Sequence, residues 1–217
     1  MICGGPIGSF YQILEMLTSD RQLDDNIRKV LLEELKKASK NIFNLLENLL
    51  HWSKIQRSLI NIDPENYVIN NSINETLELL MPAYKQKSQT VIFNPEKEFT
   101  VYADQDSINL VLRNIISNAV KFTPNKGNII IQLSQDKSTT SIFVSDTGVG
   151  MDKDVIENIF RAASFHTTFG TNGEKGSGLG LILCRDFIER NGGVIRTESE
   201  PGKGTIMVFT LPNFPQS

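Results

Sequence analysis

Two asparagines and a lysine recur along one apolar segment near the middle of the chain. Asn114 and Asn118 are four residues apart and Lys121 follows three residues later, so a helix would present them on one side. An amide oxygen is a hard ligand of the kind that Mg²⁺ accepts, and an ammonium group is a point charge for phosphate. The spacing predicts a magnesium and phosphate site, although a solvent-facing polar stripe would show the same pattern.

A second group combines a carboxylate with two glycines. Asp146 follows the strand-like run Ile142–Ser145 and precedes Gly148 and Gly150. A carboxylate at a strand end can accept a hydrogen bond from an exocyclic amine such as that of adenine, and glycines let the backbone approach a planar base. An ordinary strand-to-turn Asp-Thr-Gly has the same composition, so the group indicates base binding only together with the others.

A third group is a glycine run that opens a helix. Gly176, Gly178 and Gly180 alternate with Ser177 and Leu179, and the amino terminus of a helix offers free amides to phosphate. The run is not a dinucleotide fingerprint, because a loop precedes it and no βαβ unit surrounds it. It also lacks the Gly-Lys-Ser/Thr of a Walker loop. With the first two groups it predicts a nucleotide pocket; alone it would fit a flexible loop entering a helix.

The composition restricts the class of protein. The chain has 217 residues, 40% of them apolar, and a net charge of −3, which allows a sizeable core and does not indicate nucleic acid as a partner. No apolar run approaches the ~20 residues of a membrane span, and we expect neither a membrane segment nor a signal peptide. Cys3 and Cys184 are far apart, which favours a reducing, cytoplasmic location. His51 and His166 are expected to be ordinary surface or packing residues.

Residues 1–60 are expected to form a helical hairpin, with helices from Pro6 to Leu17 and from Asp24 to Ser58. The longer helix carries apolar residues in alternating steps of four and three: Leu31, Leu35, Ala38, Ile42, Leu45, Leu49 and Trp52. Because two helices cannot cover so wide a stripe, we expect a homodimeric four-helix bundle. A hairpin docked on the rest of its own chain is the alternative.

Residues 64–217 are expected to form a second domain, since Pro64 breaks the helical pattern. Strands are predicted at Tyr67–Ile69, Thr90–Phe93, Thr100–Ala103, Asn128–Leu133, Thr140–Ser145, Val194–Glu198 and Thr205–Thr210, and helices at Ser72–Lys87, Asp104–Phe122, Asp152–Phe160 and Ser177–Arg190. Ser72 and Glu75 match a capping box, and Pro82 predicts a kink or a stop. This order predicts an α+β fold, with helices on one face of a mixed sheet.

The three groups together resemble the signature of sensor histidine kinases of two-component systems. Asn114, Asn118, Lys121, Phe122 and Thr123 fall on the family's N box, Asp146, Gly148 and Gly150 on its first glycine box, Phe160 on its phenylalanine box, Gly176, Gly178, Leu179 and Gly180 on its second glycine box, and Gly202–Thr205 on a last glycine-threonine element. The resemblance implies a dimerisation hairpin followed by an α/β sandwich of the Bergerat-type ATP-binding fold.

The resemblance also implies ATP and Mg²⁺ as ligands and ATP:protein-histidine phosphotransfer as the reaction. It makes Asn118 the magnesium ligand and Asp146 the adenine reader, with Asn114 and Lys121 among the catalytic groups. A mobile lid over residues 161–175 would close on the phosphates, with Lys175 near the γ-phosphate and Thr205 near the base. Implied partners are a second copy of the chain and a response regulator receiver domain. The chain could be the cytoplasmic part of a longer, membrane-bound sensor.

Two departures from the family pattern are expected to matter. Ala163 stands where the lid often has a second phenylalanine, which affects one packing contact. The phosphoacceptor histidine, five positions before Pro6, is replaced by Met1, and Ile2 stands in place of the acid that follows it. We therefore expect ATP binding without autophosphorylation, with the histidine either lost by truncation or substituted.

Other functions fit some of the same residues. Hydrolases of this fold place a glutamate four residues before the magnesium asparagine; here that residue is Asn114, and an amide is not a general base. A non-catalytic signalling scaffold is favoured by the missing acceptor and disfavoured by the complete set of pocket residues. In a third alternative the chain is still a kinase, and it phosphorylates the histidine of another protomer.

Overall fold

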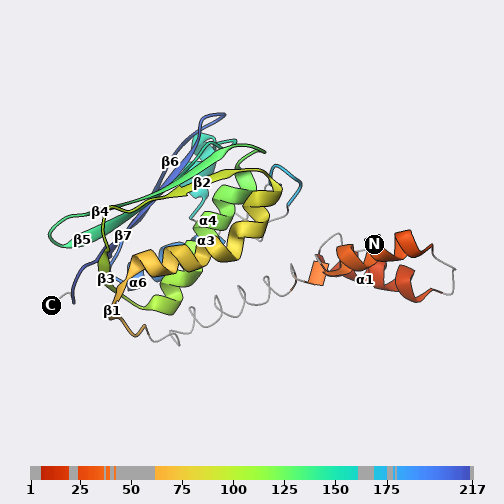
Figure 1. Ribbon diagram of the computed structural model, residues 1–217, viewed down its shortest axis with the longest axis horizontal. Helices are drawn as coiled ribbons and strands as arrows, with labels where there is room; N and C mark the ends of the chain where they lie inside the picture. Colours follow the sequence, from red (N-terminus) through yellow and green to blue (C-terminus); the bar gives the residue numbers. More distant parts are fainter. Residues whose placement is uncertain are drawn as a thin grey trace. The chain divides into compact units, whose positions relative to one another are not determined.

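The computed structural model describes residues 6–19, 24–36, 38–39, 42, 62–160, 169–174, 178 and 180–215. The chain divides into two compact units, unit 1 (Met1–Leu59) and unit 2 (Ile60–Ser217), which are considered separately (Figure 1). Several predicted features lie outside the described residues: Leu45, Leu49, His51, Trp52, Ala163, His166, Lys175, Gly176, Ser177 and Leu179.

Almost all of the described residues of unit 1 are helical. Helix α1 spans Pro6–Thr18, and residues 25–36, 38–39 and 42 are also helical. The predicted seam is more covered than its neighbours: Ala38 is buried, Leu31 and Leu35 are half-buried, and Leu32 is 50% exposed. Among the described residues, no helix has both the length and the apolar character that crossing a membrane requires.

Unit 2 is built on a five-stranded sheet, which is mixed as predicted. Its strands lie in the order β2 (Thr90–Phe93), β4 (Asn128–Gln135), β5 (Thr139–Asp146), β7 (Gly204–Pro212) and β6 (Ile195–Glu200). Strand β2 runs parallel to β4, and the other neighbours are antiparallel. A separate antiparallel pair joins β1 (Glu65–Val68) to β3 (Thr100–Ala103).

Three helices cover one face of this sheet (Figure 1): α3 (Ile69–Gln86), α4 (Gln105–Phe122) and α6 (Gly180–Arg190). The short helix α5 (Lys153–Asn158) lies between β5 and α6 in the sequence. Alternate residues of the sheet face the helices, so Ile129 and Ile142 are fully buried whereas Ile130 is 37% exposed. Each buried aliphatic side chain of this kind contributes roughly 1.5–3 kcal/mol to folding.

Helix α4 contacts both α3 and α6 and supplies much of the core. The spacing of its apolar residues places one side of the helix against the sheet. Its fully or nearly fully buried residues are Ile108, Val111, Leu112, Ile115, Ile116, Ala119 and Val120. The polar residues of the predicted site, such as Asn114 and Asn118, therefore lie on the side of α4 that faces away from this core.

The start of α3 corrects one prediction. The helix begins at Ile69, three residues before Ser72, so Ser72 and Glu75 do not form a capping box. Ser72 is instead buried in the first turn, and its hydroxyl has no hydrogen-bond partner among the described residues. The helix starts early because the Ile69 N–H donates to the Phe99 carbonyl at 3.0 Å. A tertiary contact has thus replaced the local cap.

The helix does not stop at Pro82, because α3 continues through this residue to Gln86, and the alternative of a kink stays a prediction. Within a helix, proline cannot donate to the carbonyl four residues earlier, and its ring crowds that carbonyl. That carbonyl belongs to Glu78, and both Pro82 and Glu78 are exposed, so water can serve the carbonyl that loses its partner.

Candidate functional site

The amino-terminal end of α4 is held by two side chains. Asp104 is the N-cap, as predicted, and its carboxylate accepts a hydrogen bond from the Ser107 N–H at 2.8 Å. Asn191, which directly follows α6 and is 5% exposed, accepts from the Asp104 N–H at 2.7 Å and donates to the Ser107 hydroxyl at 3.0 Å. These bonds fix the start of α4 against the end of α6.

Asn114 and Asn118 are both half-buried on α4, one turn apart and on the side away from the core. The Asn114 Nδ2 donates to the Leu110 carbonyl at 3.0 Å. Its Oδ1 faces Gly180, where an added Cβ would lie 2.8 Å from that oxygen. The first residue of α6 can approach α4 this closely because it is a glycine, and the approach brings Asn114 of the N box against Gly180 of the second glycine box.

The first glycine box packs against the carboxyl-terminal end of α4. The Gly148 N–H donates to Asp146 Oδ1 at 2.8 Å, and the Val149 N–H donates to the Phe122 carbonyl at 3.2 Å. A Cβ on Gly148 would lie 2.5 Å from Asp146 Oδ1 and 2.8 Å from the Phe122 carbonyl. Any larger residue at this position would separate the Asp146 turn from α4.

Asp146 has an unusual electrostatic environment. Burial raises the pKa of its carboxyl group to about 6, although hydrogen bonds from the backbone amides of Gly148 and Thr205 act in the opposite direction. Thr205 stands directly opposite Asp146 in the pairing of β5 with β7. The carboxylate is thus a partly desolvated hydrogen-bond acceptor at a strand end.

The β6–β7 turn closes against the same loop. Gly150 has φ of +68°, and a Cβ there would overlap the Glu200 carbonyl. The Gly202 N–H donates to the Val149 carbonyl at 2.8 Å, and the Met151 N–H donates to the Ser199 hydroxyl at 2.9 Å. The glycine-threonine element and the first glycine box therefore lie next to each other.

Lys121 lies near the other components of the site. Its ammonium nitrogen is 4.5 Å from the centroid of the Phe122 ring. Burial lowers the pKa of Lys121, and the nearby carboxylate of Glu174 acts in the opposite direction. Residues 169–174, which we call the lid base, reach this point because the Thr171 N–H donates to the Lys121 carbonyl at 3.1 Å.

The structure therefore brings most of the predicted groups together around the carboxyl-terminal half of α4. Asn114 meets Gly180, Phe122 meets Gly148, and Asp146 meets Thr205. Phe160 is half-buried just after α5, and Gly178 has φ of +73°. The roles of all these residues stay predictions, and Lys175, Gly176 and Leu179 lie outside the described part of the chain.

The sequence did not predict two buried polar residues between α3 and β2. Lys87 is 4% exposed and Gln89 is 7% exposed, and both donate to the Val120 carbonyl in the last turn of α4. In the sequence they alternate with polar neighbours after a helix, which is the pattern of an exposed turn. Only contacts with residues more than 30 positions away distinguish them.

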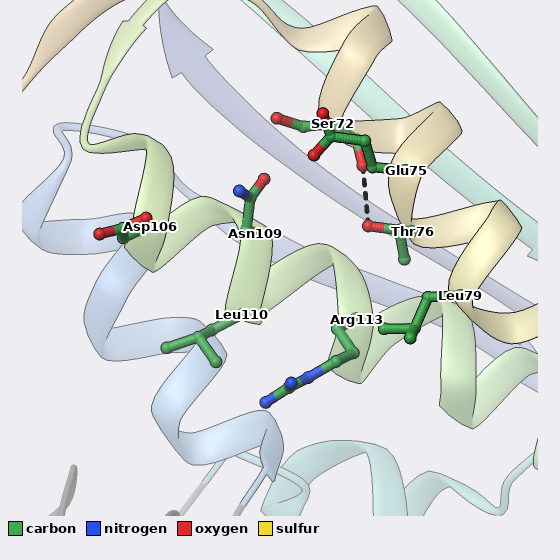
Figure 2. A pocket seen from close by; sticks show the side chains of 8 residues that line it. All are labelled: Ser72, Glu75, Thr76, Leu79, Asp106, Asn109, Leu110 and Arg113. Atoms are coloured by element: carbon green, nitrogen blue, oxygen red, sulfur yellow. Dashed lines mark hydrogen bonds between the residues drawn. The ribbon is translucent and has the colours of Figure 1, made fainter.

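A groove of about 370 Å³ lies elsewhere, between α3 and the first half of α4 (Figure 2). It is lined by Ser72, Glu75, Thr76, Leu79, Asp106, Asn109, Leu110 and Arg113. The Asn109 Oδ1 is buried there and, like the Ser72 hydroxyl, has no partner among the described residues. None of the predicted site residues lines this groove, so it is not the candidate nucleotide site.

Comparison with known proteins agrees with the geometry. The family model described as "Histidine kinase-, DNA gyrase B-, and HSP90-like ATPase" matches residues 103–215. The sensor histidine kinase WalK of Bacillus subtilis is 30% identical over 216 residues, which cover 95% of this chain and 34% of WalK. The chain spans 13% of the hybrid signal transduction protein dokA of Dictyostelium discoideum and 49% of the adaptive-response sensory kinase SasA of Synechocystis.

Solved structures show the same relationship. The catalytic domain of histidine kinase ThkA is 29% identical, with a TM-score of 0.63, over 70% of this chain and 99% of that one. The fold is also shared with ThkA in complex with its response regulator TrrA, with a TM-score of 0.76 at 23% identity over 97% and 58% of the two chains. Full-length ShkA in complex with AMPPNP has a TM-score of 0.72 at 22% identity over 96% and 43%.

The sheet and the helices that cover it thus occur here in the fold of a histidine kinase catalytic domain. The chain belongs to the histidine kinase-, DNA gyrase B- and HSP90-like ATPase family, and its relatives within that family are sensor histidine kinases.

Proposed function

We propose that this chain is the catalytic core of a sensor histidine kinase, which binds ATP and Mg²⁺ and transfers the γ-phosphate to a protein histidine. The observation that carries the proposal is the meeting of Asn114 with Gly180, and of Asp146 and Gly148 with Phe122, around one half of one helix. In phosphoryl transfer the protein mainly positions the reactants and stabilises charge. A set of amides, glycines and a lysine without a nucleophile of its own suits that task.

The residues fit the two ligands. The half-buried carboxylate of Asp146 is an acceptor for the exocyclic amine of adenine, and Gly148 lets the turn that follows Asp146 lie against the end of α4. The amide oxygens of Asn118 and Asn114 are hard donors that would hold Mg²⁺ together with phosphate oxygens. Lys121 supplies a positive charge for the phosphates. When bound, the metal would neutralise charge on the β- and γ-phosphates.

Transfer is favoured over hydrolysis by the residue at position 114. Hydrolysis needs a general base close to the attacking water, and Asn114 cannot accept a proton. Its amide is already committed, since the Nδ2 donates to the Leu110 carbonyl. We therefore expect a phosphorylated histidine, rather than free phosphate, as the principal product.

We propose residues 1–60 and 64–217 as two domains, of which the first pairs with a second copy of the chain. The described helices of unit 1 expose several large apolar side chains, which a partner helix would cover: Tyr11, Leu14, Met16, Ile27, Val30 and Leu32. A response regulator receiver domain is the proposed acceptor of the phosphate, as the complex of ThkA with TrrA suggests. The cytoplasm is the proposed location.

The 217-residue chain is proposed to bind ATP without labelling itself, because neither of its two histidines, His51 and His166, is followed by the acidic residue of the family's acceptor pattern. A separate polypeptide carrying a kinase hairpin with an intact histidine should therefore serve as the substrate. We expect γ-labelled ATP to give acid-labile label on that polypeptide and none on this chain.

The experiment has two contradicting outcomes. Absence of Mg²⁺-ATP binding at millimolar concentration would overturn the nucleotide site. Binding followed by rapid release of labelled phosphate, without label on the supplied histidine, would make the chain a hydrolase.

A further inference from the structure

Lys87 is a buried ammonium group at the end of α3. Its side chain is 4% exposed, whereas lysine is almost never fully buried unless its charge is paired. It lies immediately after the last residue of α3, outside the motifs that the sequence singles out. A buried ammonium group requires polar partners, and the segments that supply these partners are the ones that Lys87 connects.

Four oxygen atoms surround the ammonium nitrogen. It donates to the Val120 carbonyl at 2.9 Å, the Lys121 carbonyl at 3.0 Å and the Thr171 hydroxyl at 2.6 Å, and it lies 3.3 Å from Glu174 Oε1. Lysine has three donors, so the three shorter contacts are hydrogen bonds and Glu174 completes the site as an ion pair. The two carbonyls belong to the last turn of α4, where the helix dipole favours a cation.

The other two partners belong to the lid base. The Thr171 hydroxyl lies 3.1 Å from the carbonyls of both Lys121 and Thr123, and it can donate to one of them while accepting from Lys87. Glu174 Oε2 accepts from the Asn172 N–H at 2.8 Å, and the Gly170 N–H donates to the Glu174 carbonyl at 2.7 Å. The lid base is thus a closed turn that Lys87 ties to the end of α4.

We propose that Lys87 is a positioning residue for the triphosphate: its ammonium group fastens the lid base to the last turn of α4. The inference rests on the proposed function. Asn118 and Lys121 lie on that part of α4, and the lid base leads directly into the second glycine box. Lys87 therefore acts together with the Thr171 N–H, which donates to the Lys121 carbonyl, to hold the lid base against the half of α4 that carries Asn118 and Lys121. We expect adenine binding at Asp146 not to depend on this connection.

Gln89 provides a matched control from the same segment. Its Nε2 donates to the carbonyls of Val120, Thr123 and Pro124, so it also caps α4. Its described side-chain hydrogen bonds do not reach the lid base. Gln89→Leu therefore removes helix capping without removing the connection that we propose.

The test compares the affinities of ATP and adenosine for four proteins: the wild type, Lys87→Met, the double variant Thr171→Val/Glu174→Gln, and Gln89→Leu. The double variant keeps Lys87 and its bonds to α4, so it remains informative if Lys87→Met does not fold. We expect both lid-base disruptions to weaken ATP binding about tenfold, or about 1.4 kcal/mol, and to change adenosine binding less than twofold. Gln89→Leu should lower the melting temperature and leave the ratio of the two affinities unchanged.

The outcomes separate the two claims. If the wild type binds ATP and the double variant binds it equally well, or loses ATP and adenosine affinity in parallel, the role of Lys87 is refuted while the proposed function stands. If the wild type binds neither ligand, the nucleotide site itself is refuted, and the role of Lys87 with it.

Discussion

Both ends of α4 are bound by buried polar side chains, but these side chains connect the two ends to different parts of the molecule. At the amino-terminal end, Asn191 binds the backbone of Asp104 and the hydroxyl of Ser107. At the carboxyl-terminal end, Lys87 and Gln89 bind the last carbonyls. Each end is therefore satisfied by buried polar side chains from a distant segment, as the unpaired groups of a helix terminus require.

The difference lies in what else those side chains touch. Asn191 connects α4 to the end of α6, both of which are parts of the core. Lys87 connects α4 to the lid base, and the predicted ligand groups gather on that half of the helix. We infer that the amino-terminal end maintains stability, whereas the carboxyl-terminal end also determines ligand affinity.

The largest expected effect tests this division with two asparagines on the same helix. Asn118→Ala should reduce Mg²⁺-ATP affinity on the order of a hundredfold, because it removes a proposed metal ligand. Asn109→Ala, nine residues earlier in the groove of Figure 2, should change the affinity less than twofold. Calorimetric titration of both variants would measure this. Equal effects would remove the functional distinction between the two halves of α4.

The second effect concerns stability at the opposite end. Asn191→Ala leaves the Asp104 N–H without its present acceptor, and an unsatisfied buried group costs about 1–3 kcal/mol. We expect a fall in melting temperature of roughly 4–8 °C for a loss of about 2 kcal/mol. ATP affinity, measured well below the transition, should stay within twofold. A tenfold loss of affinity in a folded variant would show that both ends determine binding.

The third effect is a pH dependence at the site. The folded-state pKa of Asp146, about 6, lies above its ordinary value of 3.8. The stabilisation from this carboxyl group is therefore fully present below about pH 4 and lost as the pH rises through 6. The side chain introduced by Asp146→Asn does not ionise, so the variant lacks this loss of stability. The unfolding free energy of the variant minus that of the wild type should therefore increase by about 1–2 kcal/mol between pH 4 and pH 7.5.

Denaturant unfolding of both proteins at the two pH values would measure that increase. Asp146→Asn should at the same time bind ATP poorly, since its amide presents only one acceptor to adenine. A constant difference in stability across this pH range would contradict the environment described for Asp146.

The smallest effect is at the helix cap. Asp104→Ala removes the acceptor for the Ser107 N–H and should cost about 1 kcal/mol. Asp104→Asn keeps an acceptor oxygen, so it should retain most of the stability. Thermal unfolding of the pair would test the cap, and equal losses would show that the charge rather than the hydrogen bond matters.

Local patterns predicted the elements that local chemistry determines. The 3.6-residue period of α4, its cap at Asp104 and the position of Asp146 at a strand end all follow from neighbouring residues, and the structure has each of them. Ser72 failed as a cap because α3 is started by a bond from Ile69 to Phe99, 30 residues away. The pattern contained no information about that contact.

The buried polar residues at the ends of α4 were not predictable for the same reason. Lys87 meets Val120 across 33 positions of sequence, and Asn191 meets Asp104 across 87. A lysine after a helix and an asparagine before two glycines are typical of exposed turns. Their burial is determined by the tertiary fold, which a single sequence does not display.

The most direct test of the account is amide hydrogen exchange of the wild-type chain with and without Mg²⁺-ATP. We predict slower exchange, on adding the nucleotide, in residues 114–122, 146–150 and 169–174, and no change in residues 104–108 and 187–191. Protection confined to the amino-terminal half of α4, or spread evenly along the helix, would contradict the claim that the nucleotide binds at its carboxyl-terminal half.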